Sequence, residues 1–137
     1  MTLQSLVLSR ELCEALSKKV SVPSVLFWVN WNGAVGWKVE KFAADNPELG
    51  VRSVPAYTLG EMPAVFKALG EVMGWKRMIC TDCRTELTEK NGYPEQNCSC
   101  FEHYQEQETW LFHWLEFCRL YAISKEDAEQ YLFSLLK

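Results

Sequence analysis

The chain has 137 residues and a formal net charge of −4, with 48% hydrophobic and 23% charged residues. This length and composition predict one soluble globular domain, residues 1–137, rather than a disordered or fibrous chain. The acidity lies beyond residue 70, where 12 Asp and Glu outnumber 7 Lys and Arg. Because non-specific nucleic-acid affinity depends on neutralising phosphates, this balance argues against a non-specific nucleic-acid binder.

The sequence shows no targeting segment. The first eight residues lack the basic start and the long apolar run of a secretory signal. No stretch approaches the roughly 20 apolar residues that a transmembrane helix needs. We therefore expect a cytoplasmic protein whose thiols stay reduced.

The first predicted helix follows Ser9, whose hydroxyl can accept hydrogen bonds from the free amide groups of a first helical turn. The helix runs to about Lys19, and Pro23 keeps the chain from continuing in helical geometry. Leu8 can pack back on Cys13 as a hydrophobic staple. The side chains that we expect to be buried are Leu12, Cys13, Leu16 and Val20.

A β-hairpin is the strongest local pattern. Residues 25–31 and 34–40 are strand-like and flank Asn32-Gly33, a dipeptide that favours a two-residue turn. This turn predicts Trp31 opposite Ala34 and Trp28 opposite Trp37. One face of the hairpin, with Leu26, Trp28, Trp37 and Val39, should be buried. The other face can meet a second layer or a partner through Val25, Phe27, Val29 and Trp31.

Residues 41–57 contain several chain breakers and are predicted as a long loop. Thr58 and Glu61 then have the spacing of a capping box, in which each side chain satisfies a backbone amide of the other residue. The helix that follows should end near Gly70. One side of this helix carries Leu59, Met62, Val65, Phe66 and Leu69.

The pattern of the second half of the sequence predicts strands followed by helices. Residues 75–81 and 97–104 are candidate strands that frame a cysteine-rich hairpin at 75–104, within the single domain. A helical pattern covers 107–121, and Ser124 caps a last helix. The fold class is therefore α+β: a small antiparallel sheet, built from hairpins and covered by about four helices. The stripes of these last two helices are Trp110, Leu111, Trp114, Leu115, Cys118 and Tyr121, then Ala128, Tyr131, Leu132, Leu135 and Leu136.

Four cysteines form the chemical group of most interest. Cys80 and Cys83 make a Cys-x-x-Cys pair, and Cys98 and Cys100 make a Cys-x-Cys pair. Two pairs of thiolates can complete the tetrahedral shell of a structural zinc ion. The Cys-x-Cys spacing is less usual in zinc sites, and His103, three residues beyond Cys100, is a possible substitute for one of these ligands. The alternatives are free thiols, or a redox pair at Cys80 and Cys83 that lacks the usual helix start.

Catalytic patterns are weaker. His113 can form a dyad with Cys13 or Cys118, but both cysteines lie on apolar helix faces that are typical of inert buried thiols. The sequence has no glycine-rich phosphate loop, no Gly-x-Ser-x-Gly elbow and no His-Glu-x-x-His helix. We therefore expect no catalytic residue and no cofactor besides zinc. A hydrolase or thiol enzyme remains a third class of function.

The tryptophans and the acidic residues each have two interpretations. Four tryptophans can line a stacking platform, although aromatic residues at strand and helix periodicity are more often part of a core. The four are Trp28, Trp31, Trp37 and Trp114. Acidic residues between 102 and 116 suit a solvated helix face, and they can also repel DNA or meet a basic partner.

Two stretches together resemble small uncharacterised proteins of bacterial genomes, often found in prophages or mobile elements. The first is 9–16 with Pro23 and the aromatic strand 26–30, and the second is 54–62, followed by a Trp/Leu-rich helix at 110–120. The resemblance implies an α+β fold and a small accessory protein of unassigned activity. The cysteine-bearing segment departs from that pattern, and no catalytic residue carries over.

We therefore predict a non-enzymatic, cytoplasmic interaction protein of phage or prophage type that acts through a protein partner or through self-association. The apolar hairpin face is the expected contact surface, since large exposed apolar patches usually mark interfaces. The alternative is a zinc-ribbon module that contacts nucleic acid or a nucleoprotein complex through residues 80–103. Its local positive charge would come from Lys76, Arg77, Arg84 and Lys90. The acidic total makes nucleic acid the less expected partner, and we expect no membrane partner.

Overall fold

We describe the fold from a computed structural model, which describes residues 2–31, 36–46, 48, 50–80, 86–90, 93–95 and 104–137. This part of the chain contains four α-helices and seven strands, which confirms the α+β class. Two short 3-10 helices, η1 and η3, complete the described elements. In chain order the elements are η1 (Leu3–Leu6), α1 (Arg10–Ser17), β1 (Phe27–Asn30), β2 (Trp37–Glu40), β3 (Arg52–Pro55), η3 (Leu59–Glu61), α2 (Met62–Met73), β4 (Lys76–Cys80), β5 (Glu86–Lys90), β6 (Tyr93–Glu95), β7 (Tyr104–Glu108), α3 (Trp110–Ile123) and α4 (Lys125–Leu135).

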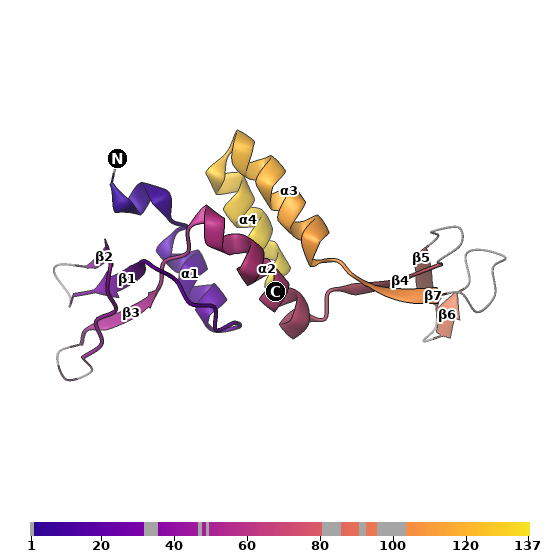
Figure 1. The fold of residues 1–137 in the computed structure, drawn as a ribbon, viewed down its shortest axis with the longest axis horizontal. Helices are drawn as coiled ribbons and strands as arrows, with labels where there is room; N and C mark the ends of the chain where they lie inside the picture. Colours follow the sequence, from indigo (N-terminus) through magenta and orange to yellow (C-terminus); the bar gives the residue numbers. More distant parts are fainter. Residues whose placement is uncertain are drawn as a thin grey trace.

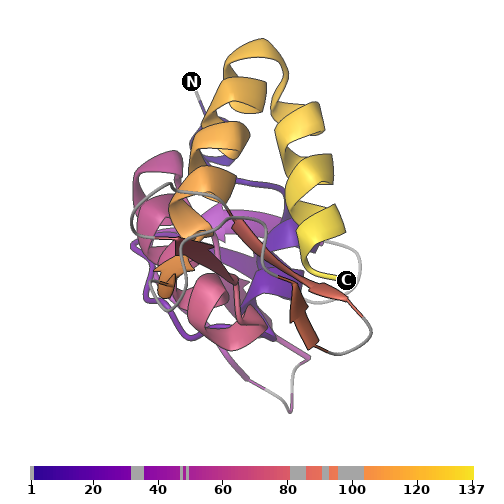
Figure 2. The ribbon, with the colours of Figure 1, turned by 90° about the vertical axis from the view of Figure 1, so that its right-hand side faces the viewer.

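The strands form two separate sheets rather than the single small sheet that we predicted. One sheet has the order β2-β1-β3, and the other has the order β6-β5-β4-β7. Figure 1 shows the first sheet at one end of the molecule, the helices in the middle, and the second sheet extending away at the other end. Figure 2 shows α3 and α4 as a helical hairpin beside each other. The helices therefore form a body, and the second sheet leaves that body.

The predicted register of the β1–β2 hairpin is wrong by two residues. Trp28 is opposite Val39 rather than Trp37, and the Trp31 amide donates to the Gly36 carbonyl at 3.2 Å. Trp31 therefore pairs with Gly36 rather than with Ala34 as predicted. The predicted turn residues, Asn32 and Gly33, lie outside the described residues. A slip of two residues keeps every side chain on its predicted face, because side chains alternate with a period of two.

The predicted loop 41–57 contains a strand that we did not predict. β3 pairs antiparallel with β1 at the sheet edge, with Val54 opposite Trp28 and Pro55 opposite Phe27. Pro55 lacks a backbone donor, and an edge position at the end of a strand tolerates this loss. The Asp45 carboxylate accepts hydrogen bonds from the Ser53 amide and hydroxyl, both at 2.9 Å, and so ties the preceding loop to the strand.

The helix caps follow the sequence prediction. Ser9 accepts from the Leu12 amide at 3.4 Å, and Ser124 accepts from the Asp127 amide at 3.3 Å. The Glu61 carboxylate accepts from the Thr58 amide at 2.9 Å, which confirms the capping box. α2 continues three residues beyond the predicted end and stops at Met73, where the next residue, Gly74, adopts a left-handed conformation with φ 68°.

The core lies between the inner face of the first sheet and the helices. All four side chains predicted for α1 are buried, and so are the predicted ones of α2 except Leu59, which is 38% exposed. The Trp28 indole Nε1 donates to the Leu8 carbonyl at 3.1 Å, which joins the sheet to the segment before α1. The Ser9 amide donates to Glu129 of α4 at 2.7 Å. The two ends of the chain therefore share one core.

The stripe predicted for α3 is rotated relative to the observed one. Phe117 is fully buried, although we did not predict it, whereas Leu111 and Leu115 are 48% and 55% exposed. Trp110, Trp114 and Tyr121 pack against the core as predicted. Because α3 is apolar on nearly all sides, its sequence does not indicate which face is inward.

Candidate functional site

The second sheet and its connections to the body form the candidate site, and we call residues 75–109 the arm. β4 pairs antiparallel with β7 over five residues, from Lys76 opposite Glu108 to Cys80 opposite Tyr104. β5 pairs with the other side of β4, with Glu86 opposite Ile79. Figure 1 shows the β4–β7 ribbon leading away from the helices. This ribbon corresponds to the predicted hairpin, but β7 begins where the second candidate strand, 97–104, was expected to end.

The strand ends of the arm show where the predicted zinc ligands attach. β4 ends at Cys80, whose backbone lies opposite Tyr104, the first residue of β7. Segment 81–85 leaves β4 at this end, and segment 96–103 enters β7 at the same end. Both cysteine-bearing segments are therefore attached to one end of the ribbon. The predicted ligands Cys83, Cys98, Cys100 and His103 lie outside the described residues, as does the side chain of Cys80.

No group of three or more metal-ligating side chains is present among the residues with described placement. The zinc hypothesis therefore concerns the end of the arm alone. The body offers no second candidate within the described ranges.

The root of the arm is held by aromatic contacts with the body. The Trp75 ring lies 4.5 Å from the His113 ring and 6.3 Å from the Phe66 ring, measured between centroids. The Arg77 guanidinium lies 4.7 Å above the Phe112 ring, and its Nε donates to Gln107 at 2.9 Å. These contacts link β4 to α2 and α3, so the start of the arm is fixed to the helices.

The predicted Cys–His dyads are not supported by the positions of these residues. Cys13 is buried, and burial raises the pKa of its thiol to about 12. Burial also raises the pKa of the Cys118 thiol. His113 and Cys118 are five residues apart on α3, which places their side chains about 140° apart around the helix. Neither described thiol has the lowered pKa that a cysteine nucleophile needs.

His113 instead contacts Tyr131 of α4. Its Nδ1 and the Tyr131 hydroxyl oxygen are 2.9 Å apart, and Trp75 covers the ring. Burial lowers the pKa of His113 below its ordinary value of 6.5. The ring therefore packs between the arm root and the last helix as a neutral group at physiological pH.

We expect the folded chain to become less stable as the pH falls below the ordinary histidine pKa. The unfolded chain protonates His113 near pH 6.5, whereas the folded chain resists protonation until a lower pH. This part of the stability is therefore complete above that value and is lost as the pH falls through it. Thermal unfolding followed by circular dichroism at about pH 7.5 and about pH 5 measures the change.

The matched variant for this measurement is His113→Phe, which keeps a ring against Trp75 but cannot titrate. Its unfolding temperature should change less between the two pH values than that of the original chain. An equal change in both proteins would show that other groups, such as the carboxylates, account for the whole effect.

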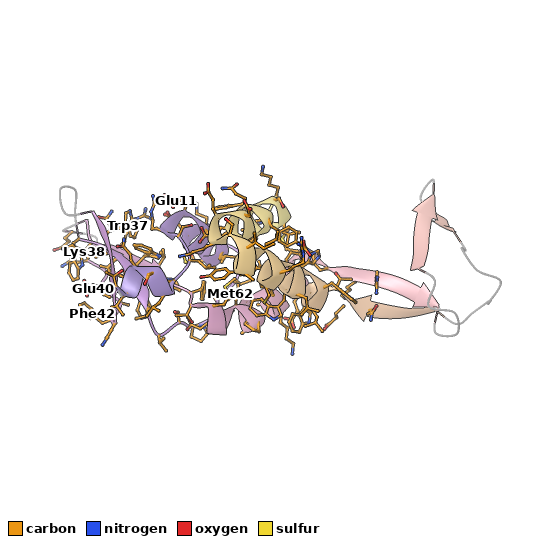
Figure 3. All side chains as sticks on the ribbon, turned by 90° about the horizontal axis from the view of Figure 1, so that it is seen from above. Glu11, Trp37, Lys38, Glu40, Phe42 and Met62 are labelled. Carbon is orange, nitrogen blue, oxygen red and sulfur yellow. The ribbon has the colours of Figure 1, made fainter. Side chains whose placement is uncertain are left out.

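The four tryptophans do not form one platform. Trp28 is buried in the core, and Trp114 contacts the Phe66 ring at 5.6 Å. Trp37 lies under two guanidinium groups, those of Arg10 at 5.2 Å and Arg52 at 4.9 Å. Figure 3 shows Trp37 toward α1, while Phe42 lies at the other side of the sheet. The four tryptophan rings therefore lie in different parts of the body and have different contacts.

The hairpin face predicted as a contact surface is partly covered by the chain itself. Val29 is fully buried, and the Trp31 ring meets the Phe42 ring edge-on at a centroid distance of 6.0 Å. Trp31 Nε1 also donates to Glu40 at 3.3 Å. Val25 and Phe42 are exposed, at 71% and 52%. The hairpin therefore does not present the continuous apolar surface that we expected, and the exposed apolar side chains lie at the edges of this face.

Comparison with protein-family models, with curated proteins and with solved structures gives no match to this chain. The resemblance to small prophage proteins therefore stays a prediction. No described helix combines the length and the apolar character that crossing a membrane requires.

Proposed function

We propose that this protein is a non-enzymatic accessory protein that binds a protein partner through its arm. The observation that carries the proposal is the β4–β7 ribbon, which leaves the helical body and is fixed to it at the root (Figure 1). A strand ribbon that projects from a fixed base suits recognition, because a partner can pair with the outer edge of its sheet without rearrangement of the core. The prophage-type resemblance agrees with an accessory role.

The charge of the arm favours a protein partner over nucleic acid. Residues 75–109 contain four Lys and Arg against seven Asp and Glu. Arg77, one of the four basic residues, is already engaged by Phe112 and Gln107. An acidic arm repels phosphates and attracts a basic protein surface.

We further propose that one structural zinc ion holds the end of the arm. Its ligands would be the thiolates of Cys80, Cys83, Cys98 and Cys100, with His103 as a possible substitute for one of them. The paired backbones of Cys80 and Tyr104 support this, because they join both cysteine-bearing segments to one end of the ribbon. Four protein ligands leave no open position, so the ion would fold the segment rather than catalyse a reaction.

The zinc part of the proposal predicts one equivalent of zinc per chain purified without added metal. The Cys83→Ser variant should lose most of this zinc, because a tetrahedral thiolate site does not retain the ion well with three cysteines. The matched control is Cys118→Ser, which removes a thiol from α3 and should keep the full equivalent. Elemental analysis measures the metal content; less than about a tenth of an equivalent in the original chain would overturn the site.

The partner part is tested by affinity capture with the full chain as bait. A protein captured by the original chain and by Cys118→Ser, but not by the Cys80→Ser/Cys83→Ser double variant, would support binding through the arm. Equal capture by the double variant would overturn it. Steep salt-dependent binding to oligonucleotides, lost on chelation, would instead favour the zinc-ribbon alternative.

A further inference from the structure

An apolar seam runs along the outward side of α3. Leu111 and Leu115 are 48% and 55% exposed, Ala122 is exposed, and Cys118 is half-buried. Their spacings of four, three and four residues are those of a coiled-coil contact line. We call these four residues the α3 seam. This spacing suits a second helix packed along the same line.

The seam is not used by the core of its own chain. Trp114 and Phe117 contact the Phe66 ring from α3, and His113 contacts Tyr131 of α4. These residues occupy the inward side of the helix, and a rotation of about 100° per residue puts the seam on the other side. The helix therefore has one apolar face packed inside and a second one exposed.

The order of side-chain sizes in the seam selects the orientation of its partner. The two large residues, Leu111 and Leu115, are followed by the two small ones, Cys118 and Ala122. An antiparallel copy of the same helix places Leu115 against Cys118 and Leu111 against Ala122, so each large side chain meets a small one. A parallel copy would stack large on large and small on small, which packs unevenly.

The flank of the seam is also complementary to an antiparallel copy. Phe112, 48% exposed, and the exposed Arg119 lie one helical position beyond the seam residues on the same side. The Phe112 ring already lies under the Arg77 guanidinium of its own chain at 4.7 Å. In antiparallel pairs the flanking positions of the two helices meet each other, so the exposed part of this ring would lie near Arg119 of the other copy. Arg119 is paired within its own chain with Glu116 at 2.6 Å, so this flank has no uncompensated like charge.

We propose that the protein self-associates through α3, with the α3 seams of two copies packed antiparallel about a two-fold axis. The seam spans about 16 Å of helix, so the contact is small. We therefore expect a weak, reversible dimer with micromolar affinity. This proposal does not depend on the arm or on zinc. It replaces the hairpin face as the surface for self-association.

Sedimentation velocity over a concentration series, with reducing agent present, tests the dimer. The average mass should rise toward that of a dimer for the original chain but stay monomeric for Leu115→Lys, which places a charge in the seam. The matched control is Val72→Lys, which changes an apolar side chain of α2 that is 59% exposed outside the seam. It should keep the concentration dependence. Circular dichroism confirms that both variants are folded.

The orientation is tested by the double variant Leu115→Lys/Cys118→Asp. In the antiparallel pair each Lys faces an Asp of the other copy, so association should recover relative to Leu115→Lys alone. In a parallel pair like charges would face each other, and association would stay lost. A monomer at the highest concentration of the original chain, or a dimer that Leu115→Lys leaves unchanged, would overturn the proposal. The arm cysteines are intact in every variant, so this outcome is separate from the test of the arm.

Discussion

Replacing Phe66 with alanine should lower the free energy of unfolding by about 3–5 kcal/mol. The Phe66 ring is fully buried and meets three other rings, those of Trp75, Trp114 and Phe117, at centroid distances of 6.3, 5.6 and 5.4 Å. Truncation leaves a cavity lined by rigid rings, which cannot collapse to fill it. Urea denaturation, with the midpoint and slope compared between proteins, measures the loss.

The control for this variant is Phe42→Ala. Phe42 is 52% exposed and has one edge-on contact with Trp31, so its truncation should cost less than about 1 kcal/mol. Equal losses in the two variants would mean that Phe66 is not central to the core. Phe66 also contacts Trp75 at the arm root, so the same substitution should loosen the connection between body and arm.

The second large effect should come from Glu61→Ala, which we expect to cost about 2–3 kcal/mol. The Glu61 carboxylate accepts four hydrogen bonds. Two come from the amide and hydroxyl of Thr58, at 2.9 and 3.1 Å, and one from the Ser24 hydroxyl at 2.9 Å. The fourth comes from the Val25 amide at 3.1 Å. One side chain therefore caps the start of the helical segment and also holds the segment that leads into β1.

A milder variant, Glu61→Gln, tests how much of this effect depends on the negative charge of Glu61. Glu61→Gln keeps the shape and one acceptor oxygen, so it should cost roughly 1 kcal/mol, between the original chain and Glu61→Ala. The exposed Glu48 gives a control, and Glu48→Ala should leave the denaturation midpoint almost unchanged. If Glu61→Ala also left it unchanged, the hydrogen bonds of Glu61 would not contribute to the fold.

The features that could be predicted from the sequence are those decided by neighbouring residues. The caps at Ser9, Thr58 and Ser124 each depend on residues within three positions of one another, and the structure confirms them. The strand β3 depends on pairing with β1, about 25 residues earlier, and its own residues give only a weak signal. The hairpin register was wrong because both registers bury the same face.

The candidate site could be predicted in part for the same reason. The approximate positions of β4 and β7 follow from their flanking residues. That Cys80 lies opposite Tyr104 follows only from the pairing of two distant strands. Our prediction of the inward face of α3 was wrong because Leu115 and Phe117 are both apolar. Only tertiary packing shows that Phe117 is buried and Leu115 is exposed. Exposed leucines in an otherwise apolar helix have no local signature, so the α3 seam required the fold.

Because Cys13 is deeply buried, chemical modification of its thiol reports how often the core opens. Its thiol lies in the core with no exposed surface and donates to the Leu8 carbonyl at 3.6 Å. With a pKa of about 12, it forms almost no reactive anion at neutral pH. An alkylating reagent can therefore modify this position only during the brief intervals when the surrounding helices separate. The rate of Cys13 alkylation, followed by mass spectrometry without denaturant, would therefore measure how often the native protein opens its core.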